Sequence, residues 1–356
     1  MTQRKTTRAQ TSSRSRPRSV PATEPPAPSF HPPYRASWFD RFTAFVERLP
    51  GPYWVPYAVA FLAHFGLAAL LAWQGGRVLT RGAALTDILP YYGFWLIHYL
   101  NLRAASALQR FRTAFIGTES DLQDTRWRLT TLPATPALVI SLIGFVLGVV
   151  SSLNFARGSP ESIIERLAYY ATTVFASLYA YHAIRQLRLV TWLYAKRAVV
   201  DIHNVAPLYS FSTLSAQTAI GMLLILSGAV LITPQQLTGV FLVGTFLFGA
   251  LAVLTFLLPL TGLHHRLAEA KEQELLDNNR RWQACTAELY RRVDRRDWAG
   301  ADRLNTTLTA LERGRVTIER IPTWPWRPET LRSLVAALLL PITIWLIQFG
   351  LQKVLG

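Results

Sequence analysis

The stretch LPATPALVISLIGFVLGVVSSL (residues 132–153) holds no charged side chain. A helix needs about 20 apolar residues to cross the hydrocarbon core of a bilayer, and this stretch supplies them. Residues 211–232 and 237–263 are two further windows without a charge. Helices on the surface of a soluble protein keep a polar face, and none of these windows has one. The sequence therefore predicts an all-α fold, a polytopic transmembrane helical bundle.

The same reading along the whole chain predicts seven spans, at residues 52–73, 85–102, 132–153, 167–184, 211–232, 237–263 and 331–351. The second is the weakest, because it contains Asp87 and Pro90 and a charge inside a bilayer costs about 3 kcal/mol or more. A six-span alternative would discard it. With seven spans and an inner N-terminus, 32 of the 37 lysines and arginines lie on the inner side. This bias favours seven spans, a cytoplasmic N-terminus, an external C-terminus and a multi-pass protein of the plasma (inner) membrane.

The chain divides into five predicted segments: a disordered basic tail (1–36), an interfacial amphipathic helix (37–51), a six-helix transmembrane region (52–263), a cytoplasmic helical insert with an elbow (264–327) and the last transmembrane helix (328–356). The tail is rich in Arg, Ser and Pro, so it cannot bury enough apolar surface to fold, and we expect it to lie against anionic lipid headgroups. An organelle transit peptide is the alternative interpretation of the tail. Ser37 and Asp40 have the spacing of a capping box at the start of the amphipathic helix.

The predicted insert is highly charged and contains two apolar stripes at helical spacing, separated by a break at residues 294–300. This pattern predicts a hairpin of two helices. The apolar side of the hairpin needs a packing partner, either the neighbouring inner loops or a second copy of the chain. The second arrangement would make the protein a homo-oligomer. Three prolines, at 322, 325 and 328, exclude a helix between the insert and the last span and predict a stiff extended elbow.

Polar residues inside the predicted spans are the candidate functional residues. In the second span Asp87, Tyr91 and His98 fall on one helical face, and in the fourth span a polar and aromatic stripe repeats at similar spacing. If both stripes line one cavity, with an amide of the last span, the candidate residues are Asp87, Tyr91, His98, Tyr170, Thr173, Ser177, Tyr181 and Gln348. The alternative is that Asp87 bonds a neighbour and His98 is an ordinary interhelical hydrogen-bonding residue.

Three small or kinking residues are candidates for helix packing. Gly144 and Gly148 form a GxxxG pattern, which lets two membrane helices approach closely. Pro341 lies in the middle of the last span, where it removes a backbone hydrogen bond and is expected to kink the helix.

The sequence lacks the short motifs that are typical of catalytic, nucleotide-binding and metal-binding sites. It contains no Gly-rich phosphate loop, no GxSxG, no HExxH and no pair of cysteines, since Cys285 is the single cysteine. The adjacent His264 and His265 project in different directions on a helix and lack further metal ligands. We therefore expect no catalytic residues, no metal site and no cofactor. The net charge of +16 is carried by the predicted inner loops, so no nucleic-acid partner is expected.

Two resemblances follow from these patterns. The ending Trp324-Pro-Trp-Arg-Pro-Glu-Thr-Leu-Arg, which leads into Leu338-Leu-Leu-Pro341 and Trp345-Leu-Ile-Gln348, resembles prokaryotic membrane proteins without an assigned function. From about residue 52 onward, the predicted outline is similar to the superfamily of insect gustatory and odorant receptors. This resemblance in outline implies a tetrameric ligand-gated cation channel whose last helix lines the pore and whose inner extensions assemble the tetramer.

The sequence thus predicts an oligomeric receptor-like or channel-like membrane protein, with the lipid bilayer as its first partner. The alternative is a membrane scaffold or assembly factor that acts through its cytoplasmic helical insert. A membrane enzyme acting on lipid is a third interpretation, and only the histidine pair at 264–265 offers groups for it.

Overall fold

The computed structural model describes residues 30–76, 81–154, 160–232 and 239–355. The chain divides into a first unit, Met1–His31, and a second unit, Pro32–Gly356, and the architecture below is that of the second unit. The predicted basic tail therefore lies outside the described residues as far as residue 29.

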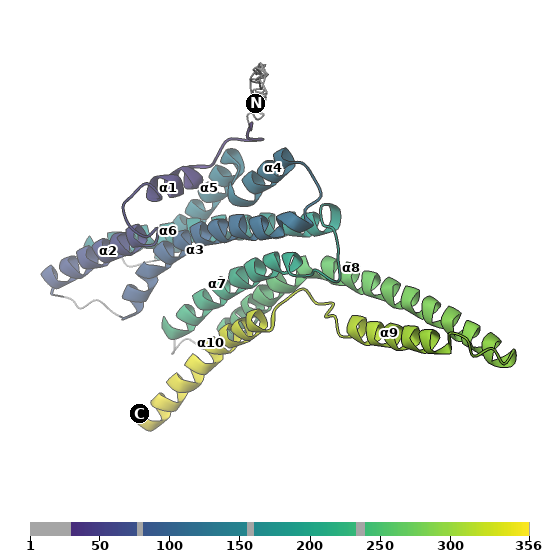
Figure 1. Cartoon of the computed structure of the whole chain (residues 1–356). Coiled ribbons are helices and arrows are strands. Elements are labelled where there is room, and N and C mark those ends of the chain that lie inside the picture. Colours follow the sequence, from purple (N-terminus) through teal and green to yellow (C-terminus); the bar gives the residue numbers. More distant parts are fainter. Residues whose placement is uncertain (1–29, 77–80, 155–159, 233–238, 356) are drawn as a thin grey trace, which may run out of the picture. The chain divides into compact units, whose positions relative to one another are not determined.

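Helices make up the regular structure of the described residues, which contain no strand beyond the isolated bridges Ala36–Pro133 and Phe115–Ala198 (Figure 1). The helices are α1 (Trp38–Val46), α2 (Val55–Gln74), α3 (Arg81–Phe111), α4 (Glu119–Thr130), α5 (Ala134–Ser151), α6 (Pro160–Lys196), α7 (Ser210–Ile232), α8 (Gly239–Asp294), α9 (Ala301–Glu319) and α10 (Pro328–Leu355). The prediction of an all-helical fold is confirmed for this part of the chain.

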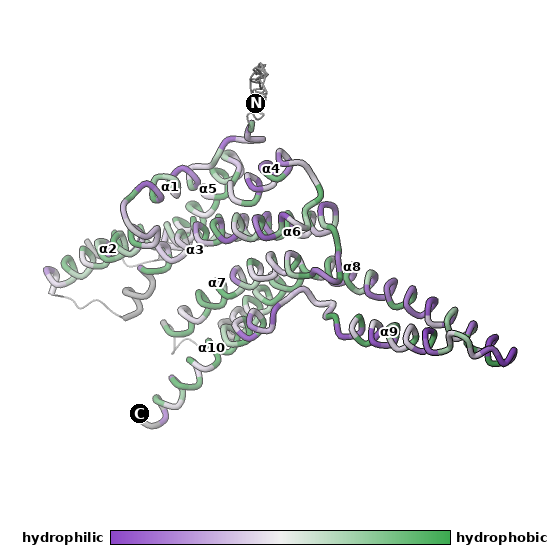
Figure 2. Tube along the Cα trace, viewed as in Figure 1, coloured by the Kyte–Doolittle hydropathy of each residue, from purple (hydrophilic) through white to green (hydrophobic). Residues whose placement is uncertain are grey.

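Five of these helices are long and apolar enough to cross a membrane. They are α2, α5, α7, the first part of α8, and α10. Figure 2 shows these segments as mainly apolar, whereas α9 and the second part of α8 carry many hydrophilic residues. The prediction of a membrane protein agrees with this pattern.

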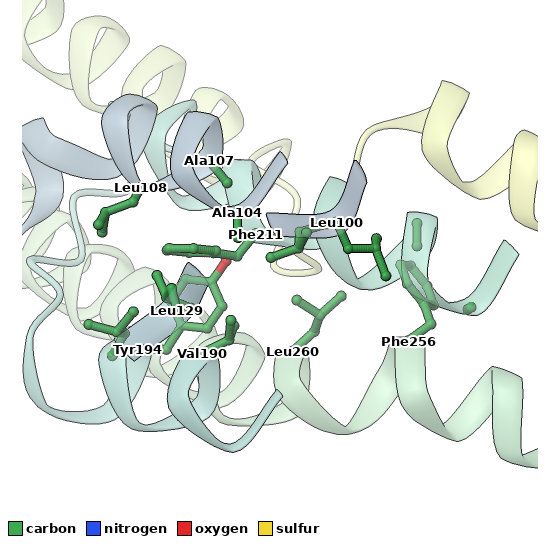
Figure 3. Close-up of a cluster of buried hydrophobic side chains, with 14 of the residues drawn as sticks. Leu100, Ala104, Ala107, Leu108, Leu129, Val190, Tyr194, Phe211, Phe256 and Leu260 are labelled. Atoms are coloured by element: carbon green, nitrogen blue, oxygen red, sulfur yellow. The ribbon is translucent and has the colours of Figure 1, made fainter. Parts of the chain in front are cut away.

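The helices α3 and α6, which correspond to the predicted second and fourth spans, are outside this group of five. Both lie against several other helices: α3 packs on α2, α4, α6 and α7, and α6 packs on α3, α5 and α8. Leu100 of α3, Val190 and Tyr194 of α6, Phe211 of α7 and Leu260 of α8 meet in one buried apolar cluster (Figure 3). Both helices therefore contribute side chains to the interior of the bundle.

Backbone hydrogen bonds join three chain segments at one end of the bundle. The amide of Ser37 donates to the Leu132 carbonyl at 3.0 Å, which links the start of α1 to the start of α5. The amide of Ile116 donates to the Arg197 carbonyl at 2.8 Å, which links the segments that follow α3 and α6. We call residues 32–54, 103–133 and 185–210 the basic end, because they hold twice as many lysines and arginines as acidic residues.

Beyond this end, α8 continues to Asp294 and α9 runs back beside it (Figure 1). Asn278 Nδ2 donates to the Leu311 carbonyl at 3.2 Å, and Lys271 Nζ donates to the Glu319 and Ile321 carbonyls at 2.7 and 3.0 Å. The two helices pack as a hairpin, and the non-helical residues 295–300 between them coincide with the break in the sequence pattern.

The elbow at residues 321–327 is not helical, as its prolines predicted, and α10 begins at Pro328. Its aromatic side chains form a stack on α8. The Trp324 ring lies 4.0 Å from the His264 ring and 4.5 Å from the Trp326 ring, and Trp326 in turn lies 5.6 Å from Phe256. This column fixes the elbow to the helix from which the hairpin extends.

Candidate ligand-binding cleft at the basic end

Helix α1 is anchored at its first turn. Ser37 caps the helix with Asp40, and both halves of the predicted capping box are present. Asp40 Oδ2 accepts from the Ser37 amide at 3.1 Å, the Ser37 hydroxyl at 2.6 Å and the Leu132 amide at 2.9 Å. Burial raises the pKa of Asp40, while these hydrogen bonds oppose that shift. The carboxylate therefore holds the start of α1 against the start of α5.

The remaining length of α1 has two different sides. Phe39, Thr43 and Val46 are buried against the bundle, and Trp38 Nε1 donates to the Ser141 hydroxyl at 3.0 Å. On the other side Phe42, Phe45 and Leu49 are exposed apolar side chains. Exposed aromatic and aliphatic side chains beside charged ones are typical of a helix in a membrane interface.

A cleft of about 400 Å³ lies between α1, α3 and α4. This volume is in the range of small-molecule sites, about 300–1,000 Å³. Its charged and polar lining residues are Asp40, Arg41, Thr43, Glu47, His98, Asn101, Arg126, Thr130 and Thr131, together with Trp127. The cleft thus presents both charge signs to whatever enters it.

His98 links the floor of this cleft to two other helical segments. Its Nδ1 lies 3.0 Å from the Tyr57 hydroxyl on α2, and its Nε2 lies 2.9 Å from Glu47 Oε1 just after α1. Because a carboxylate only accepts, Nε2 donates to Glu47 and Nδ1 accepts from Tyr57. His98 is 2% exposed and Glu47 is 50% exposed, so a buried ring orients a carboxylate that ligands can reach.

Other polar groups of the cleft have hydrogen-bonding or charge-pairing capacity that the described residues do not use. Asn101 is 8% exposed, and its Oδ1 has no hydrogen-bond partner among the described residues. The guanidinium groups of Arg41 on α1 and Arg126 on α4 are exposed, and neither forms an ion pair within the described part of the chain. A buried acceptor without a partner costs free energy that a ligand donor would recover.

A second hollow of about 660 Å³ adjoins the cleft and shares Ala36, Arg41 and Trp127 with it. Tyr34 and Arg35 line it. The Tyr34 hydroxyl donates to the Thr131 carbonyl at 2.9 Å and accepts from Arg185. Burial raises the pKa of Tyr34, and the neighbouring Arg185 opposes that shift.

The predicted polar stripe of α3 faces α2. Asp87 is buried, with Oδ1 3.5 Å from His64 Nε2, and the Tyr91 ring lies 5.7 Å from the His64 ring. His98, on the same stripe, bonds Tyr57 of that helix. The stripe therefore makes interhelical contacts at two depths, and only its His98 end reaches the cleft.

The predicted polar stripe of α6 faces α5. A Cβ atom at Gly144 would lie 2.6 Å from the Thr173 carbonyl oxygen and 2.7 Å from the Ser177 hydroxyl, and one at Gly148 would lie 2.4 Å from Thr173 Oγ1. The Tyr170 hydroxyl lies 3.0 Å from Ser152 Oγ. The structure thus brings Gly144 and Gly148 to Tyr170, Thr173 and Ser177 at the contact between α5 and α6.

The remaining predicted residues lie elsewhere in the bundle. Tyr181 is partly buried beside the apolar core. Gln348 Nε2 donates to the Leu231 carbonyl at 3.2 Å, which joins α10 to the end of α7. Pro341 is buried within α10, which continues as one helix through it.

His98 is the one predicted site residue among those that line the cleft, and the sequence interpretation did not select Glu47, Arg41, Arg126 or Trp127. Each lies on an amphipathic or loop-adjacent segment, and no pattern in the sequence connects residue 47 with residue 98. No protein-family model, no curated protein and no solved structure matches the chain. The functional proposal therefore rests on the geometry of this cleft.

Proposed function

We propose that the chain crosses a membrane seven times, through α2, α3, α5, α6, α7, the first part of α8, and α10. Helices α2 and α3 pack together and are joined by a short connection, and so are α5 and α6. If α2 and α5 cross the bilayer, then α3 and α6, which follow them after short connections and pack beside them, must cross the bilayer as well. This reasoning adds α3 and α6 to the five apolar helices.

The low hydropathy of α3 and α6 fits this proposal. Asp87 of α3 faces His64, and His98 of the same helix faces Tyr57. The Tyr179 hydroxyl of α6 donates to the Thr218 carbonyl of α7 at 2.9 Å. Polar groups of membrane helices face protein rather than lipid. The many arginines of the basic end favour the cytoplasmic side for that end and for the hairpin.

In this membrane setting, we propose that the protein is receptor-like and binds a small polar ligand in the cleft of the basic end. The observation that carries the proposal is the buried His98 imidazole holding Glu47 at a cleft of about 400 Å³ that also contains two arginines. Convergent polar groups of opposite charge in a hollow of this size are typical of ligand sites.

The channel-like form of the proposal has less support. It requires α10 to line a pore, yet the large side chains exposed along the middle of α10 are apolar, among them Leu339, Ile342 and Phe349. Gln348 is engaged with α7 through the Leu231 carbonyl. Such a surface suits lipid or a second copy of the chain, so an oligomer remains part of the proposal.

Native mass spectrometry of the purified full chain tests the ligand site. Ala105 lines the cleft, whereas its exposed neighbour Ser106 does not. We expect the wild-type protein to carry a copurified small molecule, Ala105→Trp to lose it because the indole fills the cleft, and the matched control Ser106→Trp to keep it. A wild-type protein without any adduct, or equal adducts in both variants, would contradict the proposal.

The scaffold alternative is favoured by a separate observation. The hairpin of α8 and α9 exposes Trp282, Tyr290 and Trp298, and Trp298 near the turn is 66% exposed. Exposed aromatic residues are enriched at protein interfaces. If the hairpin binds a partner protein, proximity labelling from the full chain in its membrane should enrich a defined protein that the double variant Tyr290→Ala, Trp298→Ala loses.

A further inference from the structure

We infer that the cleft of the basic end binds the headgroup of an aminophospholipid, with its primary ammonium at Glu47 and its phosphate between Arg41 and Arg126. This inference rests on the proposed function, because it names the ligand class of the same site. Three sets of observations carry it: the acceptors around Glu47, the two arginines on different helices, and the exposed apolar side chains of α1.

The acceptors of the cleft point to a cation with N–H donors. One oxygen of Glu47 accepts from His98, and the other is open to a ligand, because Glu47 is half exposed. Asn101 Oδ1 is a second acceptor, buried at the same cleft and without a partner in the described residues. A primary ammonium has three donors and satisfies both, whereas a quaternary ammonium has none to offer.

The arginines point to a phosphate. Arg41 stands on α1 and Arg126 on α4, so the two guanidinium groups approach the cleft from different helices. Guanidinium groups bind phosphate oxygens through paired, charge-assisted hydrogen bonds. A ligand with an ammonium and a phosphate matches both charge signs of the lining at once.

The surroundings of the cleft favour a membrane lipid as the source of that headgroup. Phe42, Phe45 and Leu49 are exposed on and just after α1, and Trp54 is exposed before the apolar helix α2. These side chains suit the boundary between headgroups and acyl chains. If the lipid headgroup is held between α1, α3 and α4, the acyl chains of the same lipid lie next to these apolar side chains.

The experiment measures lipid binding to the full chain in detergent by native mass spectrometry. The probes are phosphatidylethanolamine, phosphatidylcholine and phosphatidylglycerol at equal concentration. We expect wild-type protein to bind phosphatidylethanolamine about tenfold or more tightly than phosphatidylcholine, since only the former has N–H donors. Glu47→Gln should remove this preference but keep the binding of phosphatidylglycerol through the arginines, which also shows that the variant is folded.

The arginines are tested by Arg126→Gln and Arg41→Gln. Both should weaken phosphatidylethanolamine and phosphatidylglycerol about equally, whereas the control Arg48→Gln, an exposed position after α1 that does not line the cleft, should change neither. Competition by soluble glycerophosphoethanolamine distinguishes the sources of the headgroup. Weak competition supports a membrane lipid, and displacement at equal concentration would overturn that assignment.

Failure of the inference is distinguishable from failure of the proposed function. If the wild-type protein loses a copurified ligand in Ala105→Trp but binds the three lipids equally, the cleft is a ligand site for another class of molecule and the inference is wrong. If neither a copurified ligand nor a lipid depends on Ala105, both proposals are wrong.

Discussion

Single small residues decide how closely helices of this bundle approach one another. At Gly144 a Cβ atom would lie 2.6 Å from a backbone oxygen, the Thr173 carbonyl, which cannot move away without shifting α6. At Gly66 on α2 nothing lies within 4 Å. The same substitution therefore has opposite expected effects at these two positions.

Gly144→Ala should lower the free energy of unfolding by about 1–3 kcal/mol, because the added methyl group overpacks the contact between α5 and α6. Gly66→Ala is the matched control. It should leave stability unchanged or raise it by about 0.5–1 kcal/mol, through the better helix propensity of alanine. Thermal unfolding in detergent measures both, and equal effects would mean that α5 and α6 do not pack as described.

Asp121 should make the stability of the protein depend on pH. Its carboxylate accepts from the Thr118 amide and hydroxyl, each at 2.9 Å, and lies 3.4 Å from Arg197. The hydrogen bonds from Thr118 lower the pKa of Asp121 below its usual value of 3.8. A carboxyl with a lowered folded pKa adds stability above its unfolded pKa and loses it as pH falls through the folded pKa.

The expected result for Asp121→Asn is a lower melting temperature at neutral pH. The difference from wild type should narrow as the pH falls below about 4, where the wild-type carboxyl also becomes protonated. Melting curves of both proteins between neutral and acidic pH provide the check. A difference that stays constant over this range would rule out the carboxylate as its cause.

At the scale of elements, the elbow and the hairpin form one unit with α8. The Trp324 ring stacks between the rings of His264 and Trp326, and Lys271 donates to the last carbonyl of α9 and to the Ile321 carbonyl of the elbow. The hairpin is therefore fixed at its base, while its tip near Trp298 is exposed.

Trp324→Ala should loosen the elbow. Loss of an aromatic pair costs about 1 kcal/mol, which corresponds to about fivefold faster proteolysis of residues 319–328 where cleavage follows local opening. Trp298→Ala at the tip is the control and should leave cleavage at the elbow unchanged. Limited proteolysis followed by mass spectrometry locates the cuts, and an unchanged rate in Trp324→Ala would show that the stack does not hold the elbow.

For the whole molecule, the number of spans decides on which side each functional surface lies. Seven spans with a cytoplasmic N-terminus place the C-terminus outside, and they place the basic end and the hairpin on the same inner side. An even number of spans would place the two termini on the same side.

Paired fusions of alkaline phosphatase and a fluorescent protein after Gly356 measure the side of the C-terminus. We expect high phosphatase activity and low fluorescence, as an external C-terminus requires. The reverse pattern would remove one span from the proposal, and α3 would then be the first to reconsider because it carries Asp87.

Several elements of this protein could be predicted from local sequence patterns, whereas the helix α4 at Glu119–Thr130 was not predicted. The charge-free window 132–153 contains the helix Ala134–Ser151, and the capping box at Ser37 forms. The helix α8 ends at Asp294, and the proline-rich residues 321–327 are not helical. These features depend on residues that are close together in the sequence and on the hydropathy that a membrane helix requires. A local sequence pattern is therefore enough to predict them.

Which faces of the helices meet could not be predicted from local patterns, because it depends on packing between segments that are distant in the sequence. The polar stripes of α3 and α6 have the expected periodicity, yet one faces α2 and the other faces α5. Close approaches set this rotation: a Cβ atom at Gly93 of α3 would lie 2.4 Å from the Phe175 ring of α6. The contact between Glu47 and His98 results from such packing between distant segments. It could not be predicted, because the helical periodicity of one segment does not show which segment packs against it.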